Sequence, residues 1–288
     1  MEQGRKNEFV QLSGHSGAFA VSSPWTILKR RDASESHELS AYRQLMLQDS
    51  GMQQFVPKFH REVQLSGESY LELEDLMQHF SNPSIMDVKM GCRTFLESDT
   101  ANPELRPDLY KKMTAVDPNQ PTEEERRAGA ITKLRYMLFR EQESTTVSLG
   151  FRLEAIKTRD PESCSAHSRR LKTIKTESEV LPVIHYFCAY NAAVMRSFAA
   201  RLRELKSALE KSDFFARHEF IGSSLLFLHD ASLRAGVWMI DFAKTLPRPD
   251  GERLQHTVPW TPGSHEDGYL IGLNNLIRLM ESASGEYV

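Results

Sequence analysis

Short apolar runs alternate with polar turn residues over the first eighty positions of the chain. The runs are rich in β-branched and aromatic residues, and Gly, Ser and Pro separate them, which is typical of strands joined by turns. One segment differs, because its apolar residues recur every three or four positions and predict an amphipathic helix over 38–46. The predicted strands are 9–13, 19–21, 25–29, 55–63 and 69–73. We therefore expect a small antiparallel sheet with one inserted helix.

The rest of the chain mixes helical and strand-like spacing. Thr122 is followed three residues later by Glu125, a capping box that precedes apolar residues at helical spacing and predicts one helix over 122–141. The same spacing predicts helices over 187–209 and 269–280, whereas the polar stretch 158–180 is expected to be a loop. The predicted strands of this part are 85–90, 219–229 and 236–242.

These patterns predict an α+β fold with two lobes that together make one domain. A β-rich lobe is expected over residues 1–83 and a mixed lobe over 84–288. The polar segment 75–83 ends in Asn-Pro, which disfavours a continuing helix and suits a connector between the lobes.

Composition narrows the class of protein. Of the 288 residues, 40% are hydrophobic and 26% are charged, and the net charge of -3 gives no reason to expect nucleic acid as a partner. Cys92, Cys164 and Cys188 are spaced for neither a disulfide framework nor a zinc site. No apolar run reaches the roughly 18 residues of a spanning helix, so we expect no transmembrane segment and a cytoplasmic location.

Candidate nucleotide-binding residues lie in the first lobe and near the end of the second. Gly14 to Gly17 form a glycine-bearing turn that could approach a phosphate, although a plain turn explains them equally well. Lys29 ends an apolar strand and Glu38 lies on the following helix, an arrangement that orients nucleotide phosphates in protein kinases; the alternative is a strand-end lysine in solvent. Asp241, in Trp-Met-Ile-Asp-Phe-Ala-Lys, resembles the metal-binding Asp-Phe-Gly of kinases. No His-Arg-Asp catalytic loop is present, which disfavours an ordinary protein kinase.

Candidate acceptor residues occupy the strand at 85–90. Alternation places Asp87 and Lys89 on one face, where a carboxylate could orient a hydroxyl and an ammonium could offset phosphoryl charge. The alternative is a surface ion pair of little consequence. Residues 105–140 hold eight Lys and Arg against five Asp and Glu, and Lys133, Tyr136 and Arg140 share a helix face. That face suits a phosphate-rich ligand, or else it is simply solvated.

A family resemblance follows from these motifs. Pro-x-x-x-Asp-x-Lys-x-Gly is complete at Pro83, Asp87, Lys89 and Gly91, and it resembles the signature of the inositol polyphosphate kinases. Segments 149–157, 223–227 and 240–242 add to it. Within that family the chain is most similar to the inositol 1,4,5-trisphosphate 3-kinases, through segments 110–113, 116–118, 121–125 and 132–140. It departs from them at Ala243, at Leu134 and over 158–180.

The resemblance implies a kinase-like catalytic domain with a helical inositol-binding insertion at about 95–148 of the second lobe. The implied reaction transfers the ATP γ-phosphate to the 3-hydroxyl of inositol 1,4,5-trisphosphate, a step of calcium signalling, and yields the 1,3,4,5-tetrakisphosphate and ADP. Lys89 is the implied transition-state residue, and Asp87 orients the hydroxyl or the nucleotide. The nucleotide and Mg²⁺ would be held by Lys29, Glu74, Asp75, Leu76, Asp87, Lys157 and Asp241, with Ser224 as a second metal ligand. The implied substrate residues are Lys89, Arg106, Lys112, Lys133, Arg135, Tyr136, Met137, Arg140 and Lys244.

Three alternatives stay open. A broad-specificity inositol phosphate multikinase would use the same core, and a non-catalytic module would bind inositol phosphates without ATP turnover. The segment at about 106–116 combines basic residues with apolar anchors in the style that calmodulin recognises, so it could serve substrate, calmodulin or both.

Overall fold

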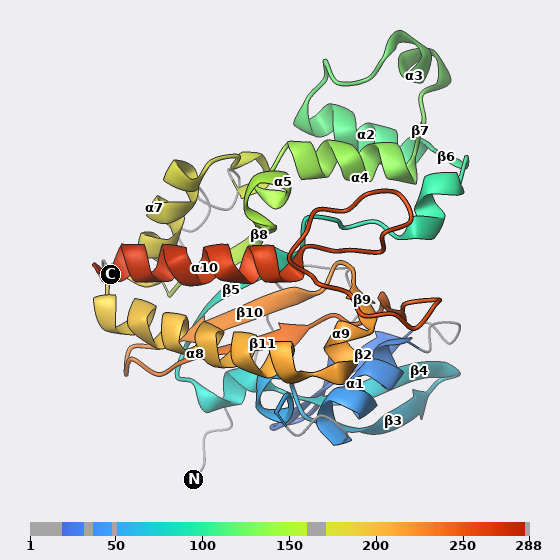
Figure 1. Ribbon diagram of the computed structural model, residues 1–288. Helices are drawn as coiled ribbons and strands as arrows, with labels where there is room; N and C mark the ends of the chain where they lie inside the picture. Colours follow the sequence, from blue (N-terminus) through green and yellow to red (C-terminus); the bar gives the residue numbers. More distant parts are fainter. Residues whose placement is uncertain (1–18, 32–36, 48–50, 160–170, 286–288) are drawn as a thin grey trace.

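Two four-stranded antiparallel sheets organise the part of the chain that the computed structural model describes, namely residues 19–31, 37–47, 51–159 and 171–285 (Figure 1). The predicted strand at 9–13 and the turn from Gly14 to Gly17 lie outside these residues. The first sheet has the order β1-β2-β4-β3 and, with one helix and a 3-10 turn, forms what we call the N-lobe. Its elements are β1 (Phe19–Ser23), β2 (Thr26–Arg31), α1 (His37–Leu47), η1 (Gln53–Phe55), β3 (Phe59–Leu65) and β4 (Glu68–Glu74). The third strand begins later than predicted, because 53–55 form a 3-10 turn that buries Phe55 completely.

The second sheet has the order β11-β10-β5-β8 and is the centre of the C-lobe, which also contains the helices that cover it. The connector between the lobes carries a 3-10 turn, η2 (Leu76–His79). The strands are β5 (Ser84–Met90), β8 (Phe151–Lys157), β9 (His218–Phe220), β10 (Ser224–His229), β11 (Ala235–Ile240) and β12 (Thr245–Pro247), of which β9 pairs only with β12. The helices are α7 (Glu177–Phe187), α8 (Ala192–Lys211), α9 (Asp213–Ala216), α10 (Tyr269–Ser284) and the 3-10 turn η4 (Leu171–Thr173).

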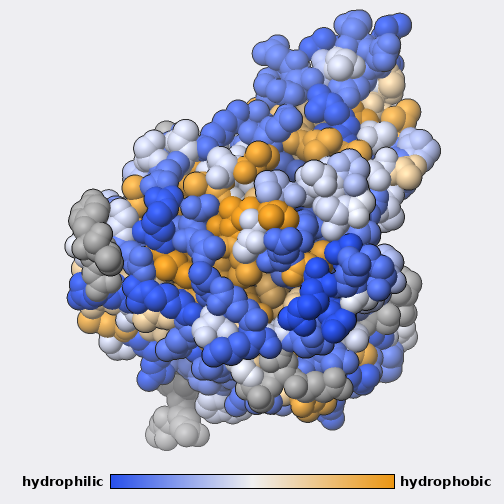
Figure 2. All heavy atoms as spheres, in the orientation of Figure 1, coloured by the Kyte–Doolittle hydropathy of each residue, from blue (hydrophilic) through white to orange (hydrophobic). Residues whose placement is uncertain are grey.

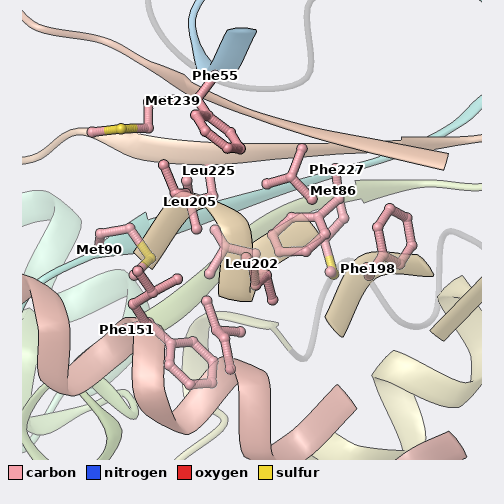
Figure 3. Packing of buried hydrophobic residues seen from close by; sticks show 14 of the residues in the cluster. Phe55, Met86, Met90, Phe151, Phe198, Leu202, Leu205, Leu225, Phe227 and Met239 are labelled. Atoms are coloured by element: carbon pink, nitrogen blue, oxygen red, sulfur yellow. The ribbon is translucent and has the colours of Figure 1, made fainter. Parts of the chain in front are cut away.

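The two faces of the second sheet have different tasks. On β5, Met86, Val88 and Met90 enter the main hydrophobic core. Figure 3 shows Met86 and Met90 there beside Leu202 and Leu205 of α8. Ile85 lies on the opposite face, where it packs with Leu76 of the connector and with Leu228. Because side chains alternate along a strand, Asp87 and Lys89 continue the face of Ile85, as the sequence predicted. This face is turned away from the hydrophobic core and from α8, and it carries the candidate residues Asp87 and Lys89.

Besides the connector, several contacts join the N-lobe to the C-lobe, and two of them involve aromatic rings. Tyr42 of α1 packs edge-on against Phe242, with ring centroids 5.0 Å apart. Arg201 of α8 lies over the ring of Phe55 at 4.0 Å and donates a hydrogen bond to the backbone carbonyl of Gln54. The lobes are thus joined on both sides of the molecule.

A close backbone approach holds α10 to the sheet. Gly272 of α10 passes so near to Gly150 that a Cβ added to Gly272 would lie 2.0 Å from the Gly150 carbonyl oxygen. The same carbonyl accepts a hydrogen bond of 2.8 Å from the amide of Gly91. Only residues without a side chain permit this contact.

The insertion projects from the C-lobe as a small helical unit (Figure 1). Its elements are η3 (Glu97–Ala101), β6 (Leu105–Arg106), α2 (Pro107–Val116), α3 (Glu123–Ala128), β7 (Ile131–Thr132), α4 (Lys133–Gln142) and α5 (Thr146–Leu149). A separate hydrophobic cluster of Leu109, Met113, Ile131 and Phe139 stabilises it. In the space-filling view its tip around α3 is hydrophilic, whereas hydrophobic residues gather over the middle of the C-lobe around α8 and α10 (Figure 2).

The single helix predicted over 122–141 was wrong. The capping box of Thr122 and Glu125 exists, but the helix ends at Ala128 because Gly129 adopts a left-handed conformation with φ 60°. A new helix then starts at Lys133, where the Thr132 side chain accepts a hydrogen bond from the Arg135 amide.

Three other predicted segments also need correction. The helix predicted over 187–209 is broken, because Ala189 and Tyr190 have positive φ and Asn191 caps a new helix. Part of the predicted loop over 158–180 is helical, since η4 and the first turn of α7 fall within it, and residues 160–170 lie outside the described part of the chain. The strand predicted over 219–229 is divided into β9 and β10. In the described part of the chain no helix is both long and apolar enough to cross a membrane.

Candidate active site

Lys29 lies between two carboxylates at the meeting point of the lobes. Its Nζ is 2.6 Å from Glu38 Oε1 on α1 and 2.6 Å from Asp241 Oδ1, directly after β11. Burial alone would lower the pKa of Lys29, but the negative charges of Asp241 and Glu38 raise it above its ordinary value. Lys29 is therefore a permanent cation. The predicted pairing of Lys29 with Glu38 is confirmed, and Asp241 joins it.

Asp241 ends its strand in an unusual backbone conformation. Its φ is 66°, which is uncommon for a residue with a side chain, and the next amide, of Phe242, donates to Glu38 Oε1 at 3.2 Å. Burial would raise the pKa of Asp241, but the charges of Lys29 and Lys89 hold it below the ordinary range. The side chain is 42% exposed, so an ionised carboxylate is presented to solvent at this point.

Ser224 lies beside Asp241 with an unused hydroxyl. Ser224 is the cross-strand partner of both Ile240 and Lys89, so its side chain shares their face of the sheet. It is 1% exposed, and its Oγ has no hydrogen-bond partner among the residues described. A buried hydroxyl next to an ionised carboxylate offers hard oxygen ligands, which fit Mg²⁺.

Asp87 and Lys89 lie on the same face, one strand away from Ser224. Asp87 is 3% exposed, and Lys89 Nζ lies 3.9 Å from Glu154 Oε1 on β8. The charge of Lys89 also acts on Asp241. The ammonium of Lys89 is therefore near enough to Asp241 to act on it electrostatically. An ammonium in such a position can neutralise charge on a phosphoryl group during transfer.

The carboxylates of Glu74 and Asp75, at the start of the connector, already have hydrogen-bond partners within the protein. Glu74 accepts hydrogen bonds from the Lys58 amide at 3.1 Å and pairs with His79 at 2.8 Å. Asp75 accepts from the Met77 amide at 3.0 Å, while its own amide donates to the Trp25 carbonyl. Leu76 is buried against Ile85 and Leu228, on the face of the sheet that carries Asp87 and Lys89. Any ligand at this edge would thus meet backbone groups and apolar surface more than free carboxylates.

The remaining predicted residues divide into three groups. Lys157 is the partner of Ile85 at the connector end of β5, and Lys244 follows β11 close to Asp241 in the chain. In the insertion, Lys133 pairs with Asp99 at 3.0 Å, whereas Arg106 and Lys112 both pair with Asp108. Tyr136, Met137 and Arg140 follow Lys133 on one face of α4.

Arg135 is placed differently from its neighbours on α4. Its Nε lies 2.9 Å from Glu125 Oε1, and its Nη2 donates to the Gln120 carbonyl, so it joins α3 to α4. Two positions along a helix from Lys133, it cannot share the face of Lys133 and Arg140. Its assignment to the substrate stays a prediction.

Sequence reasoning assigned no role to two charged residues of β8. Arg152 and Glu154 lie in the predicted segment 149–157 and form an ion pair of 2.6 Å directly beside Lys89. The signal was available, because charged residues that alternate with Phe151, Leu153 and Ile156 in a buried strand must face a polar site.

Comparison with known proteins agrees with this geometry. The family model described as inositol polyphosphate kinase matches residues 70–281. The chain is 47% identical to human inositol-trisphosphate 3-kinase A and 46% identical to the mouse protein, over 96% of its own length in each case. It is 43% identical to an inositol-trisphosphate 3-kinase homolog of Caenorhabditis elegans, also over 96% of its length. It spans 59%, 60% and 56% of these three relatives, respectively.

A solved structure shows the same fold. The inositol phosphate multikinase of S. cerevisiae, in complex with ADP and Mn²⁺, is 17% identical, with a TM-score of 0.58 over 90% of this chain and 98% of the other. The predicted kinase-like α+β fold is thereby confirmed. Since the family model covers most of the chain, from β4 to α10, the chain belongs to the inositol polyphosphate kinase family.

Proposed function

We propose that this domain transfers the γ-phosphate of ATP to the 3-hydroxyl of inositol 1,4,5-trisphosphate, giving the 1,3,4,5-tetrakisphosphate and ADP. The observation that carries the proposal is the arrangement of Lys29, Glu38 and Asp241 on the same side of the sheet as Asp87 and Lys89. In this arrangement Lys29 would contact the nucleotide phosphates and Asp241 would bind a metal ion, both next to the proposed acceptor residues Asp87 and Lys89. The 3-kinase relatives support the choice of substrate.

The nucleotide would lie between the lobes. Lys29 and Lys157 would contact its phosphates, and the backbone at Glu74, Asp75 and Leu76 would contact the adenine, whose ring would rest on the apolar surface of Leu76. Asp241 and Ser224 would hold Mg²⁺, which when bound neutralises phosphate charge. The half-exposed carboxylate of Asp241 and the unpartnered hydroxyl of Ser224 support this assignment.

The acceptor would enter from the insertion. The oxygen of the 3-hydroxyl forms a bond to the γ-phosphorus as the bond from that phosphorus to ADP breaks, and Lys89 stabilises the charge of the group in transit. Asp87 orients the hydroxyl, whose proton passes to this carboxylate or to solvent. Because such transfer is loose, positioning contributes more than proton abstraction. The substrate phosphates would be held by Lys112 and Arg106 of α2 and its start, by Lys244, and by the α4 residues Lys133, Tyr136, Met137 and Arg140.

Product analysis tests this function. Purified protein is given magnesium ATP and inositol 1,4,5-trisphosphate, and phosphorus NMR of the product locates the new phosphate. A new phosphate at position 3 and one ADP per product support the proposal. Rapid turnover of tetrakisphosphates would favour a multikinase, and binding without ADP formation would favour a non-catalytic module.

Calmodulin binding at about 106–116 is a separate proposal, and the structure sets a condition on it. Met113 is fully buried and Leu109 is 8% exposed in the cluster of the insertion. A partner that grips apolar anchors could reach them only if α2 left the insertion, so calmodulin and substrate would compete. Loss of substrate affinity on adding calcium-loaded calmodulin would support this arrangement.

A further inference from the structure

Arg152 and Glu154 of β8 lie beside Lys89 on the neighbouring strand β5. Arg152 is the cross-strand partner of Lys89, so both side chains project from the same face of the sheet. The register then shifts, because Asp87 lies opposite Ala155 and Val88 opposite Leu153, which makes Glu154 the extra residue of a bulge. Arg152 and Glu154 are two positions apart on the strand, so Glu154 shares this face, where its Oε1 is 2.6 Å from Arg152 Nε and 3.9 Å from Lys89 Nζ.

Buried positive charge converges on this one carboxylate. Arg140 of α4 is 7% exposed, and the side chain of Arg152 is 8% exposed. The positive charges of Arg152, Lys89 and Arg140 hold the pKa of Glu154 below its ordinary value even though burial would raise it. Glu154 is therefore ionised and serves three cations.

Arg140 and Arg152 oppose each other electrostatically. Burial first and then the charge of Arg152 lower the pKa of Arg140, while Glu154 and, less strongly, Glu143 act against this. Glu143 is itself paired with Lys175 at 2.8 Å. Arg152 also donates to Thr146 Oγ1 at 3.3 Å, which fixes its guanidinium in place. Three cations act on the single carboxylate of Glu154, so positive charge exceeds negative charge here and an added anion would be favourable.

We propose that Arg152 and Glu154 are unassigned residues of the phosphate site: Glu154 positions Lys89, and Arg152 supplies, with Arg140, the buried charge that a phosphate of the substrate neutralises. The inference rests on the proposed function in that it takes the anion to be a phosphate of an inositol phosphate. A dianionic phosphate matches the two guanidiniums, which donate in the planar geometry that phosphate oxygens accept.

The two residues should respond to substitution in opposite ways. Arg152→Met removes a cation, so we expect the KM for inositol 1,4,5-trisphosphate to rise at least about 10-fold while the KM for ATP is unchanged. Glu154→Gln removes an anion near the bound phosphates but frees Lys89. We expect its kcat to fall about 10-fold while the KM for the inositol phosphate stays equal or falls. Arg278→Met, which breaks an exposed ion pair with Glu177, is the matched control and should change neither constant.

Thermal stability provides a second readout that does not need turnover. Without ligand, Arg152→Met loses the ion pair with Glu154 as well as the repulsion with Arg140, and because these two effects oppose each other we expect only a small change in its melting temperature. The stabilisation of wild type by inositol 1,4,5-trisphosphate or inositol hexakisphosphate should be mostly lost in this variant. Arg152→Lys retains a charge and should recover part of the stabilisation.

The outcomes separate this inference from the proposed function. Suppose that wild type makes no tetrakisphosphate but that its thermal stabilisation by inositol hexakisphosphate depends on Arg152. This result would support the phosphate site and contradict the 3-kinase function. If turnover is confirmed and Arg152→Met keeps its substrate KM and its ligand shift, the site is overturned. An Arg152→Met protein that melts lower without ligand but keeps the full stabilisation by ligand would show a merely structural role. The same conclusion would follow if both substitutions lowered kcat and raised the substrate KM by equal factors.

Discussion

Lys29 and Asp241 are 212 positions apart in the chain, yet Lys29 Nζ lies 2.6 Å from Asp241 Oδ1. The ion pair joins the N-lobe sheet to the end of β11 in the C-lobe and closes the back of the proposed nucleotide site. It also means that the proposed metal ligand is already ionised before metal arrives, because the charge of Lys29 holds the proton off the carboxylate.

Replacing Asp241 by Asn tests the proposed metal site. The amide keeps the shape of the side chain but removes its charge, so we expect kcat to fall at least about 100-fold with the fold intact. Steady-state kinetics at several Mg²⁺ concentrations and a melting curve would measure this. Asp250→Asn, an exposed carboxylate change, is the control. Near-normal turnover in a folded Asp241→Asn protein would remove Asp241 from the site.

Lys89→Ala should affect the chemical step. We expect a large loss of kcat and little change in the KM for ATP, because the ammonium is proposed to act on the transferring group and not on the resting nucleotide. Lys58→Ala, at an exposed position of the N-lobe, should behave as wild type. If the KM for ATP rose instead while kcat held, Lys89 would belong to the nucleotide site.

Lys133 and Arg140 test the role of the insertion. Changing both to Ala should raise the KM for the inositol phosphate strongly and leave that for ATP nearly unchanged, each lost contact costing roughly 1.5–3 kcal/mol. Added salt should produce part of the same defect in wild type. The double change Arg126→Ala and Arg127→Ala removes the same charge from the exposed helix α3 and is the control. An unaltered substrate KM in the first double variant would speak against the 3-kinase assignment of the insertion.

Glu72 makes the stability of the N-lobe depend on pH. Hydrogen bonds from Arg61 and Thr26 lower its pKa from 4.5 to about 2. A carboxyl with a lowered pKa stabilises the fold fully above its ordinary value and loses this contribution as the pH falls toward the folded value. The melting temperature of Glu72→Gln should therefore lie well below that of wild type at pH about 7, and the gap should narrow between pH about 5 and 2.5. A gap that is constant with pH would show that charge is not the cause; Glu68→Gln, a more exposed carboxyl on the same strand, should show almost none.

Gly272→Ala tests the contact between α10 and the chain before β8. A Cβ at this position meets backbone atoms that cannot turn aside, so we expect a loss of at least about 1–3 kcal/mol in the free energy of unfolding. Urea denaturation would measure it, with the exposed Asn274→Ala on the same helix as the comparison. Equal stability of the two variants would mean that the helix can shift at no cost.

Much of the fold could be predicted from the sequence where local pattern and long-range packing agree. The strand with Asp87 and Lys89 was placed correctly because its apolar alternation is strong, and Lys29 and Glu38 are near enough in the chain for a short-range argument. The break at Gly129 had a local signal, a glycine that can end a helix, but the continuing apolar spacing concealed it. The break at Ala189 and Tyr190 had no such signal, since both residues ordinarily disfavour positive φ.

The site was predictable residue by residue but not as an assembly. Arg135 could not be separated from Lys133 and Arg140 without knowing that Glu125 lies on a different helix, beside it. Alternation shows that Arg152 and Glu154 share a face of their strand, but the pairing of Arg152 with Lys89 across β5 and β8 cannot be read from either strand alone. The spacing of residues along one segment predicts which side chains share a face of a helix or strand. The residues that they contact on neighbouring strands become known only from the folded structure.

The contacts of Tyr42 and Arg201 have a mechanical consequence. With Tyr42 packed against Phe242, Arg201 lying over Phe55 and Lys29 paired with Asp241, the two lobes are joined at three places besides the connector and so behave as a closed frame that resists hinge motion. Wide rotation of one sheet against the other would have to break an aromatic contact and a cation–π contact together. The insertion has its own small core and projects from the C-lobe, to which it is joined by contacts such as those of Thr94 with Glu141 and Lys175 with Glu143. We expect the admission of a bulky substrate to depend on movement of this outer unit, while the frame stays nearly rigid through the catalytic cycle.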